Sequence, residues 1–589
     1  MTAQTEPLET LNNDVNLVDP VALTGSIEEQ SSRERLKIFS KFLSDTLLRD
    51  LVAGRTSLNH QESDYPAAVL FADVFGFTNL TEKLMGQYGR EQAIGAEHLT
   101  FMLSDYFDHL VAVVLEHNGD VVKFAGDAML IMFPCSDVRL GLQRATSCGV
   151  EMQRVAKQVS ARILQQHNVI LSLKVAVSSG DIVGLVLGGV LGRWEYAVIS
   201  DAIADVGRLG DAALPHDVLI SAENLVLIDA KVEAKVEGSE LETDVRGAGI
   251  FNVIKTPSWD LAIEHQPIEL AASLEPIVRC FVPAAVASRI AAGQSDTALL
   301  GELRRVSVLF INLPQFTTDI SIDQAQKIVT TIQQACYGQR GSLDKISCDD
   351  KGVSVIAGFG VPPMSAEDDP IRAVKAAMNI HRILNSMGLG VSIGVASGPV
   401  YCGTLGDEHR CEYTLMGDVV NTAARLMSIA NDGVLCDAIT VEASRSEIEF
   451  DPGILTNLKG KDEAVETFRP LNLKVSDIKS SVSIIGREQE LNTLVEAIGH
   501  FNKPEYARAV VIEGEAGMAS RCYSTPSSKA SWRSIRMLFI GPVRVPCKFL
   551  FTVYGVSYFT RHLALAGFLV IATRRRIYST WLRILAVFG

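Results

Sequence analysis

The chain contains the same order of sequence motifs twice, and this duplication constrains its fold more than any other feature. The apolar run Val69–Asp73 has a counterpart in Val308–Asn312, and the block that begins at Trp194 returns at Cys411, about 217 residues later. The other paired blocks are 42–51 with 281–290, 119–123 with 341–345, and 173–180 with 391–398. Solenoid repeats have periods of only about 20–50 residues. The duplication therefore predicts two related domains that pair with each other.

Each copy alternates strand-like and helix-like patterns, which predicts an α/β fold. In the first copy the apolar residues before Asp73 predict a buried strand, and Gly76 predicts the turn after it. A helix is then expected from about 82 to 116. The tripeptide 118–120, Asn-Gly-Asp, is typical of a hairpin. Further strands are expected at 121–125, 128–133, 171–177, 183–186 and 195–199, and helices at 35–54, 140–166 and 201–209.

The composition suits a multidomain protein with ordinary cores. Of its 589 residues, 47% are hydrophobic and 21% are charged, which allows three or four domains. The net charge of -15 argues against a general nucleic-acid partner. The ten cysteines are scattered without a CxxC pair, so we expect free thiols in a reducing, cytoplasmic compartment. Residues 1–33 are acidic and lack an apolar signal core, so we expect disorder there and no secretion.

The C-terminal region predicts an incomplete phosphate-loop domain followed by an unusual tail. The segment 509–518 is similar to a strand that enters a phosphate loop, inside a region that we assign to 483–520. The lysine of such a loop should come next, but Ala519-Ser520-Arg521 stands there instead. Residues 521–589 contain eleven Lys and Arg and no Asp or Glu. The composition therefore changes abruptly within the expected loop.

Three interpretations of this tail stay open. A membrane span around 550–573 would be interrupted by Arg561 and His562, and it is short of the ~20 apolar residues that a span needs. A basic amphipathic segment would instead associate with a membrane surface. We favour aberrant sequence, from a shifted reading frame or a wrongly placed gene end, because of the abrupt change in composition.

Two acids in the first copy are candidates for a metal site. Asp73 ends one strand and Asp127 lies in the Gly-Asp turn of another strand pair, so both side chains can converge on one point. With the carbonyl of Val74 they offer only oxygen ligands, which suit Mg²⁺ or Mn²⁺. The backbone N–H groups after Asp73 can bind phosphate oxygens. The alternatives are a lone acid at a strand tip and an aspartate that only shapes its turn.

The second copy offers a different pair of residues, Asn421 and Arg425. They are four residues apart and so lie on one face of a helix. An arginine can stabilise the negative charge of a transferring phosphoryl group, and an asparagine can orient a sugar or a phosphate. The alternative is a solvated arginine on an amphipathic helix.

Together these motifs resemble those of the class III nucleotidyl cyclases, and among them the soluble, bicarbonate-responsive adenylyl cyclases. The resemblance covers about 42–473 and rests on the motifs 71–78, 123–128 and 420–425. It implies two ferredoxin-like α+β cyclase domains, at 34–257 and 299–473, which form a pseudo-symmetric heterodimer within one monomeric chain. Residues 258–298 would then be a linker with the helix that leads into the second domain.

The resemblance also implies one catalytic site at the interface of the two domains. Asp73, Val74 and Asp127 would hold two Mg²⁺ ions, or Mn²⁺. The reaction would convert ATP to 3′,5′-cyclic AMP and diphosphate. The other implied contacts are the backbone of Gly76, Phe77 and Thr78 with phosphate, Lys174 with the triphosphate, Asn421 with the ribose, and Arg425 with the transition state.

The choice of base is expected to depend on Lys345 and Thr414, with Leu415 beside them. By resemblance these residues face the purine edge. A lysine donates to N1 of adenine and a threonine hydroxyl accepts from its 6-amino group, whereas guanine reverses both polarities. We therefore expect ATP rather than GTP as the substrate. A lysine on a surface hairpin is the alternative.

The mirror-related cleft is expected to be inactive. Asn312 replaces the first metal acid, and Ala202 and Asp205 lie near the positions of the asparagine and arginine. Asp349 follows Lys345 by four residues, as an acid of the first copy follows its lysine, but an apparent insertion makes its placement ambiguous.

In the family this inactive cleft binds bicarbonate through a lysine and an arginine. Lys123 matches the lysine. The arginine position falls on Gly207, and Arg208 stands one residue later. One step along a helix rotates a side chain by about 100°. Bicarbonate is therefore a candidate regulator with only half of its expected site in place.

The sequence thus predicts an intracellular adenylyl cyclase of cyclic AMP signalling. Two other functions compete with it. One is an inactive scaffold that binds nucleotide or anion, which the complete set of metal and transition-state residues argues against. The other is a regulator built on a phosphate-loop ATPase, which the missing loop lysine argues against.

Overall fold

The computed structural model places two compact units, Met1–Val475 and Ser476–Gly589, and each is described here on its own. The structure describes 20–76, 92–126, 128–167, 169–228, 242–247, 249–257, 259, 261, 267–293, 301–349, 352–406, 408–457, 464–474, 509–514, 534–539, 569–577 and 580–588. Asp127, Phe77 and Thr78 therefore lie outside the described residues.

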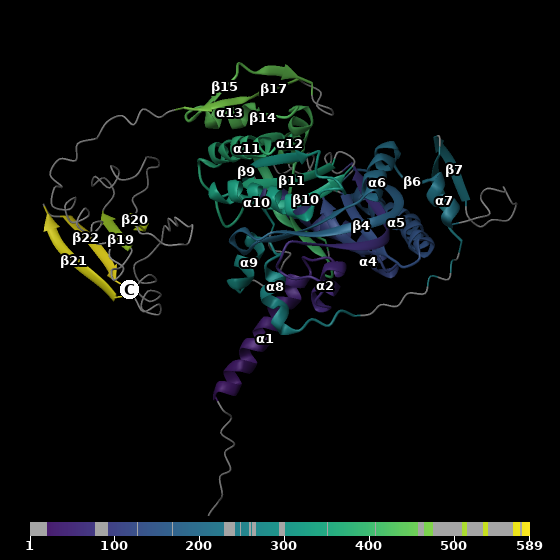
Figure 1. The fold of residues 1–589 in the computed structure, drawn as a ribbon, viewed down its shortest axis with the longest axis horizontal. Coiled ribbons are helices and arrows are strands. Elements are labelled where there is room, and N and C mark those ends of the chain that lie inside the picture. Colours follow the sequence, from purple (N-terminus) through teal and green to yellow (C-terminus); the bar gives the residue numbers. More distant parts are fainter. Residues whose placement is uncertain are drawn as a thin grey trace, which may run out of the picture. The chain divides into compact units, whose positions relative to one another are not determined.

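The first half of the larger unit forms one domain around an eight-stranded sheet (Figure 1). Two helices precede it, α1 (Pro20–Ser40) and α2 (Asp45–Val52). Its elements are β1 (Gln61–Phe75), α4 (Gln92–Glu116), β2 (Asp120–Ala125), β3 (Ala128–Pro134), α5 (Val138–His167), β4 (Ser172–Gly188), β5 (Trp194–Ile199), α6 (Asp201–Ala212), β6 (Val218–Ser221), α7 (Ala222–Ile228), β7 (Glu242–Gly247) and β8 (Ile250–Lys255).

The second half repeats this arrangement with a second eight-stranded sheet. Two short helices lead into it, α8 (Glu275–Arg279) and α9 (Ala284–Ala291). Its elements are β9 (Glu302–Leu313), α10 (Ile322–Gly338), β10 (Ser342–Asp349), β11 (Gly352–Phe359), α11 (Asp369–Ser386), β12 (Ser392–Gly406), β13 (Cys411–Met416), α12 (Asp418–Ile429), β14 (Val434–Asp437), α13 (Ala438–Ser444), β16 (Ile454–Thr456) and β17 (Val465–Phe468), with β15 (Ile448–Phe450) and β18 (Pro470–Leu473) paired beside them.

The two sheets have the same topology, which confirms the duplication and the mixed α/β fold. The first has the strand order β2-β3-β1-β4-β6-β8-β7, with β5 paired to β4. The second has the order β10-β11-β9-β12-β14-β17-β16, with β13 paired to β12. The register is also equivalent, because Asp73 pairs with Lys174 in the first sheet as Asn312 pairs with Ser392 in the second.

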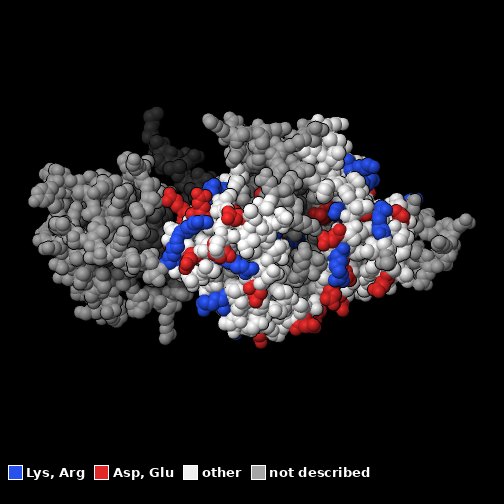
Figure 2. Space-filling view, turned by 90° about the horizontal axis from the view of Figure 1, so that it is seen from above, with Lys and Arg blue, Asp and Glu red and all other residues white. Residues whose placement is uncertain are grey.

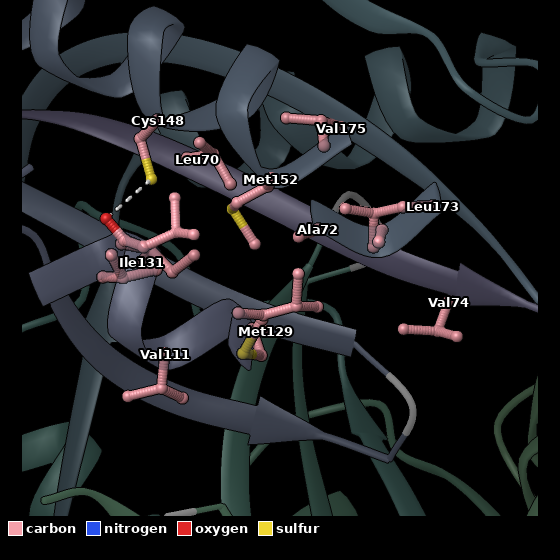
Figure 3. Packing of buried hydrophobic residues seen from close by; sticks show 14 of the residues in the cluster. Leu70, Ala72, Val74, Val111, Met129, Ile131, Cys148, Met152, Leu173 and Val175 are labelled. Atoms are coloured by element: carbon pink, nitrogen blue, oxygen red, sulfur yellow. Dashed lines mark hydrogen bonds between the residues drawn. The ribbon is translucent and has the colours of Figure 1, made fainter. Parts of the chain in front are cut away.

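The central strand β1 is buried on both faces, which explains its apolar sequence. Leu70, Ala72 and Val74 point to one face, where they pack in a cluster with Met152 of α5 (Figure 3). Val69 points to the other face, toward the cluster that contains α6 residues. Side chains alternate along a strand, so Asp73 lies on this second face. Asp73 thus follows directly after the buried apolar part of β1.

The two domains share their hydrophobic cores through exchanged strand tips. Leu185 and Leu187 of β4 belong to the cluster that fills the second domain. In the mirror-related contact, Tyr401 and Leu405 of β12 belong to the cluster that fills the first domain. The tip of β4 is held further by Gln326 of α10, whose side chain exchanges two hydrogen bonds with the Gly188 backbone at 2.7 and 2.8 Å. The pseudo-symmetric pairing is therefore built into both cores.

Several predicted elements differ from the structure. The tripeptide 118–120 is not a hairpin: it joins the end of α4 to the start of β2, and Asn118 has a φ of 60° as it turns the chain. The expected helix at 35–54 is two helices, because Ser44 caps the start of α2. The helix α1 begins at Pro20, inside the stretch predicted to be disordered. The two expected strands at 171–177 and 183–186 are one strand, β4.

The smaller unit contains a four-stranded sheet with the order β20-β19-β22-β21. Its strands are β19 (Ala509–Gly514), β20 (Ser534–Phe539), β21 (Leu569–Ile577) and β22 (Thr580–Phe588), and neighbouring strands are antiparallel. The strand predicted at 509–512 is present, whereas the expected phosphate loop at 515–521 lies outside the described residues. Within the described ranges, no helix has the length and apolar character needed to cross a membrane.

The charged side chains of the described surface are mixed in sign. Figure 2 shows Lys and Arg interspersed with Asp and Glu on the face seen from above, so that face has no continuous basic stripe. The eight cysteines that the structure describes are all free.

Candidate active site

Asp73 lies in a partly buried position beside a lysine. Its cross-strand neighbours are Ala128 on β3 and Lys174 on β4. Burial raises the pKa of the Asp73 carboxyl, the Lys174 charge acts against that rise, and Asp211 on α6 adds to it. The ammonium group of Lys174 also lies 5.9 Å from the centre of the Phe75 ring. The structure thus brings together the predicted metal acid and the predicted triphosphate lysine.

The pairing of β1 with its two neighbouring strands changes after Asp73. Pairing of β1 with β3 ends at Asp73 and Ala128, whereas pairing with β4 continues to Phe75. Among the described residues, Val74 and Phe75 of β1 therefore pair only with β4, and their other edge has no partner on β3. Gly76 follows with a φ of 98°, a conformation that favours glycine.

These residues fit a divalent cation. Asp127 is outside the described residues, but its neighbour Ala128 is the cross-strand partner of Asp73. Burial disfavours the charged form of the Asp73 carboxylate, and a cation beside it would offset that cost. Carboxylate and carbonyl oxygens, such as those of Asp73 and Val74, are ligands that suit Mg²⁺ or Mn²⁺. No cluster of three or more candidate metal ligands occurs among the side chains that the structure describes. The metal site therefore remains a prediction supported by the Asp73 environment.

Lys345 lies in the interface between the domains, not on a surface hairpin. Its side chain is only 2% exposed, and its Nζ donates to Thr414 Oγ1 at 2.6 Å and to the Phe124 carbonyl at 2.8 Å. Thr414 and Leu415 are buried on the neighbouring strand β13. The ammonium group also lies 4.0 Å from Asp344 Oδ2 and 3.8 Å from Glu412 Oε1. The predicted pair for base recognition is therefore assembled.

Asn421 and Arg425 lie on α12, which packs on β12 and β9 of the second sheet. Asn421 is exposed and Arg425 is half-buried. Within the part of the chain that the structure describes, the Arg425 guanidinium has no ion-pair or hydrogen-bond partner. A half-buried guanidinium in that situation suits an anionic ligand.

The mirror-related cleft lacks both charged members of the Asp73 pair. Asn312 is flanked by Ser354 and Ser392, at the positions of Ala128 and Lys174. The second copy therefore loses the lysine as well as the acid, which the sequence analysis did not note.

The hairpin that carries Asp349 is also longer than its counterpart. Two residues separate Ala125 from Ala128, whereas six separate Ser347 from its equivalent partner Ser354. Asp349 pairs with Gly352, two residue pairs beyond the level of Asn312. This placement resolves the ambiguity left by the sequence: Asp349 does not stand beside Asn312 as a second metal acid would.

The helix positions assigned to the inactive cleft need correction. The helices α6 and α12 begin at the equivalent residues Asp201 and Asp418. Counting from these starts, Asn421 corresponds to Ala204 and Arg425 to Arg208, not to Ala202 and Asp205.

The two candidate bicarbonate residues have different surroundings among the described residues. Lys123 lines a cavity of about 50 Å³ between the domains, and Arg208 is not among its lining residues. Arg208 is 65% exposed and pairs with Asp205 on its own helix. Lys123 instead lies 3.7 Å from Glu412. Arg208 thus pairs within its own helix, whereas Lys123 pairs with a residue of the other domain, and the bicarbonate assignment stays a prediction.

Sequence reasoning missed the charged residues around this cavity. Arg193, Glu195, Asp344, Arg410 and Glu412 all line it, and none was assigned a role. The sequence pattern that could have identified them is the motif Arg-x-Glu-Tyr, which occurs in both copies, at 193–196 and at 410–413.

The sequence profile of the family described as "Adenylate and Guanylate cyclase catalytic domain" matches residues 59–254 and 301–469. These two matches coincide with the two duplicated domains and together cover more than half of the chain. The chain belongs to this family. The same family model matches both domains, in agreement with their shared topology.

Curated relatives of the chain include two mammalian proteins named adenylate cyclase type 10. The Rattus norvegicus protein is 28% identical over 505 residues, which are 77% of this chain and 30% of that protein. The Homo sapiens protein is 28% identical over 521 residues, with shares of 79% and 31%. The chain thus spans just under a third of the length of these relatives.

Similar solved structures include two from Pseudomonas aeruginosa. A class III adenylyl cyclase-like ATP-binding protein matches 70% of this chain and 93% of its own, with a TM-score of 0.44 and 11% identity. The adenylyl cyclase CyaB matches 29% of this chain and 96% of its own, with a TM-score of 0.27 and 21% identity.

Proposed function

We propose that this protein is an adenylyl cyclase that converts ATP to 3′,5′-cyclic AMP and diphosphate. The observation that carries the proposal is the buried Lys345, held between Phe124 of the first domain and Thr414 of the second. A lysine can only donate hydrogen bonds. It therefore suits the N1 acceptor of adenine and opposes the N1–H donor of guanine. The name of the mammalian relatives agrees with this choice of base.

Each domain would supply one half of the active site, and the first domain would supply the contacts to the metal ions and the phosphates. Asp73, the Val74 carbonyl and Asp127 of the first domain would hold two divalent cations, Mg²⁺ or Mn²⁺. Such cations, when bound, lower the pKa of the ribose 3′-hydroxyl and neutralise the triphosphate. Lys174, next to Asp73 in the sheet, would contact the triphosphate, together with the backbone of Gly76, Phe77 and Thr78.

The second domain would supply the base, ribose and transition-state contacts. Lys345 and Thr414, with Leu415 beside them, face the purine. Asn421 positions the ribose so that its 3′-oxygen attacks the α-phosphorus in line as diphosphate leaves. The guanidinium of Arg425 then donates to the phosphoryl oxygens as their negative charge develops.

The test compares equivalent positions in the two copies. The full-length protein is assayed for cyclic AMP with Mg-ATP and with Mn-ATP. Asp73→Ala should lower kcat at least ~100-fold, because it removes a ligand from the metal site. The matched control Asn312→Ala, at the equivalent position of the inactive cleft, should stay near wild type. Equal activity of wild type and Asp73→Ala would contradict the metal assignment. ATP binding without turnover in the wild type would favour the inactive scaffold.

A further inference from the structure

The outer edge of β2 is held by side chains of the other domain. As an edge strand, β2 presents backbone groups that its own sheet does not pair. Glu412 accepts from the Phe124 N–H at 2.9 Å, and Lys345 donates to the Phe124 carbonyl at 2.8 Å. Arg410 donates to the carbonyls of Val121 and Val122 at 2.9 and 3.1 Å. Three charged residues of the second domain thus replace a neighbouring strand.

Glu412 is the shared anion of this group. It is 8% exposed, and its carboxylate lies 3.7 Å from Lys123, 3.8 Å from Lys345 and 3.7 Å from Arg410. Burial acts to raise its pKa, but the three cations and the Phe124 N–H together lower it below the usual range. Glu412 is therefore an ionised carboxylate that balances buried positive charge from both domains. A buried charge is tolerated only when such partners are present.

The equivalent residue of the first copy is bound differently. Glu195 pairs with Arg193, two residues before it, at 2.9 Å. Burial raises its pKa, in contrast to that of Glu412. Its strand β5 carries Ala197 where β13 carries Thr414, so it has no base-reading pair beside it. The two glutamates share burial and sequence context, but only Glu412 contacts the adenine lysine.

We propose that Glu412 is a positioning residue for base recognition, which orients Lys345 and fixes it to the strand that leads into the Asp127 turn. The inference rests on the proposed cyclase function. Phe124 links base recognition to the metal site, because Glu412 accepts from its N–H, Lys345 donates to its carbonyl, and only two residues separate it from Asp127. Without the carboxylate, Lys123, Lys345 and Arg410 repel one another, and the Lys345 ammonium leaves its place at the purine edge.

The experiment measures discrimination between ATP and GTP in the full-length protein. Glu412→Gln keeps an oxygen that can accept from Phe124 N–H and removes only the charge. We expect the ratio of kcat/KM for ATP to that for GTP to fall at least ~10-fold, mainly through a higher KM for ATP. The ratio of dissociation constants of fluorescent ATP and GTP analogues should fall in parallel. Glu195→Gln, which disturbs an equally buried ion pair, should lose comparable thermal stability and keep the wild-type ratio.

Each outcome bears on one of the two claims. A wild-type protein that neither binds nor cyclises ATP would refute the proposed function. An active wild type together with a folded Glu412→Gln that keeps the full ATP preference would overturn the positioning role alone. If Glu412→Gln does not fold, the same ratio is measured in Glu412→Asp, which keeps the charge but withdraws it by one methylene group. An unchanged ratio in that variant would equally overturn the proposal.

Discussion

At the scale of single residues, the site depends on carboxylates held in unusual surroundings. Asp344 precedes Lys345, the lysine proposed to bind adenine, and is buried, with its Oδ2 4.0 Å from Lys345 Nζ. Burial outweighs this charge and raises the pKa of Asp344 from 3.8 to about 6, and Glu412 nearby adds to the rise. The folded protein therefore binds this proton more tightly than the unfolded chain does. Stability must then fall as the pH rises from about 4 to about 6 and stay flat above it.

Asp344→Asn should remove that fall. The rise in pKa corresponds to at most about 3 kcal/mol of unfolding free energy at neutral pH. We expect the variant to have a higher Tm than wild type at pH 8 and a similar Tm near pH 3, below both pKa values of Asp344. Thermal melts followed by circular dichroism across this range test the expectation, with the exposed Asp64→Asn as the control. A constant difference in Tm at every pH would contradict the assignment to Asp344.

At the scale of elements, a single glycine sets how closely α12 approaches its sheet. A Cβ on Gly394 of β12 would collide with the Ala423 carbonyl oxygen and lie 2.5 Å from the Met427 nitrogen. The equivalent residue of the first sheet is Ala176, because both pair with the residue two places before the Asp73 or Asn312 position. The helix that carries Asn421 and Arg425 is thus seated against a position that only glycine fits.

Gly394→Ala should displace α12 and with it Arg425, the arginine proposed to stabilise the transition state. A misplacement of about 1 Å can lower a rate ~100-fold, so we expect kcat to fall 10- to 100-fold in a protein that is still folded. The reciprocal change Ala176→Gly, on the strand β4 against which the equivalent helix α6 packs, should cost only about 0.5–1 kcal/mol of stability and leave kcat near wild type, because α6 carries neither Asn421 nor Arg425. Steady-state kinetics with circular dichroism distinguish the two. A wild-type kcat in Gly394→Ala would show that α12 does not depend on this contact.

At the scale of the whole pair of domains, folding and assembly are one event because the cores are shared. Leu187 belongs to the first domain in sequence but is buried in the second domain's core. Leu187→Ala should cost about 2–5 kcal/mol. Hydrogen exchange should become faster in α10 of the second domain more than in α5 of the first. The exposed Leu214→Ala, with 58% exposure, serves as the control. Faster exchange confined to the first domain would contradict a shared core.

Much of the site is determined by the sequence alone, because its information is local and duplicated. The difference between Asp73 and Asn312 can be read along the chain, since each residue lies near the end of an equivalent strand. The helical spacing of Asn421 and Arg425 and the glycine turn at Gly76 are also local patterns. By contrast, the sequence placed a hairpin at 118–120 where a helix ends, because Asn-Gly also suits the left-handed turn after a helix.

The tertiary structure alone decided how the two halves meet. Glu412 and Phe124 are 288 residues apart in sequence, and their contact exists only because an edge strand of one sheet lies against the second domain. It also decided that Lys345 is buried between the domains and that Arg208 is exposed, away from Lys123. Periodicity and motif spacing describe what each residue does within its own element. Which charges meet across an interface depends on packing, and packing depends on both domains at once.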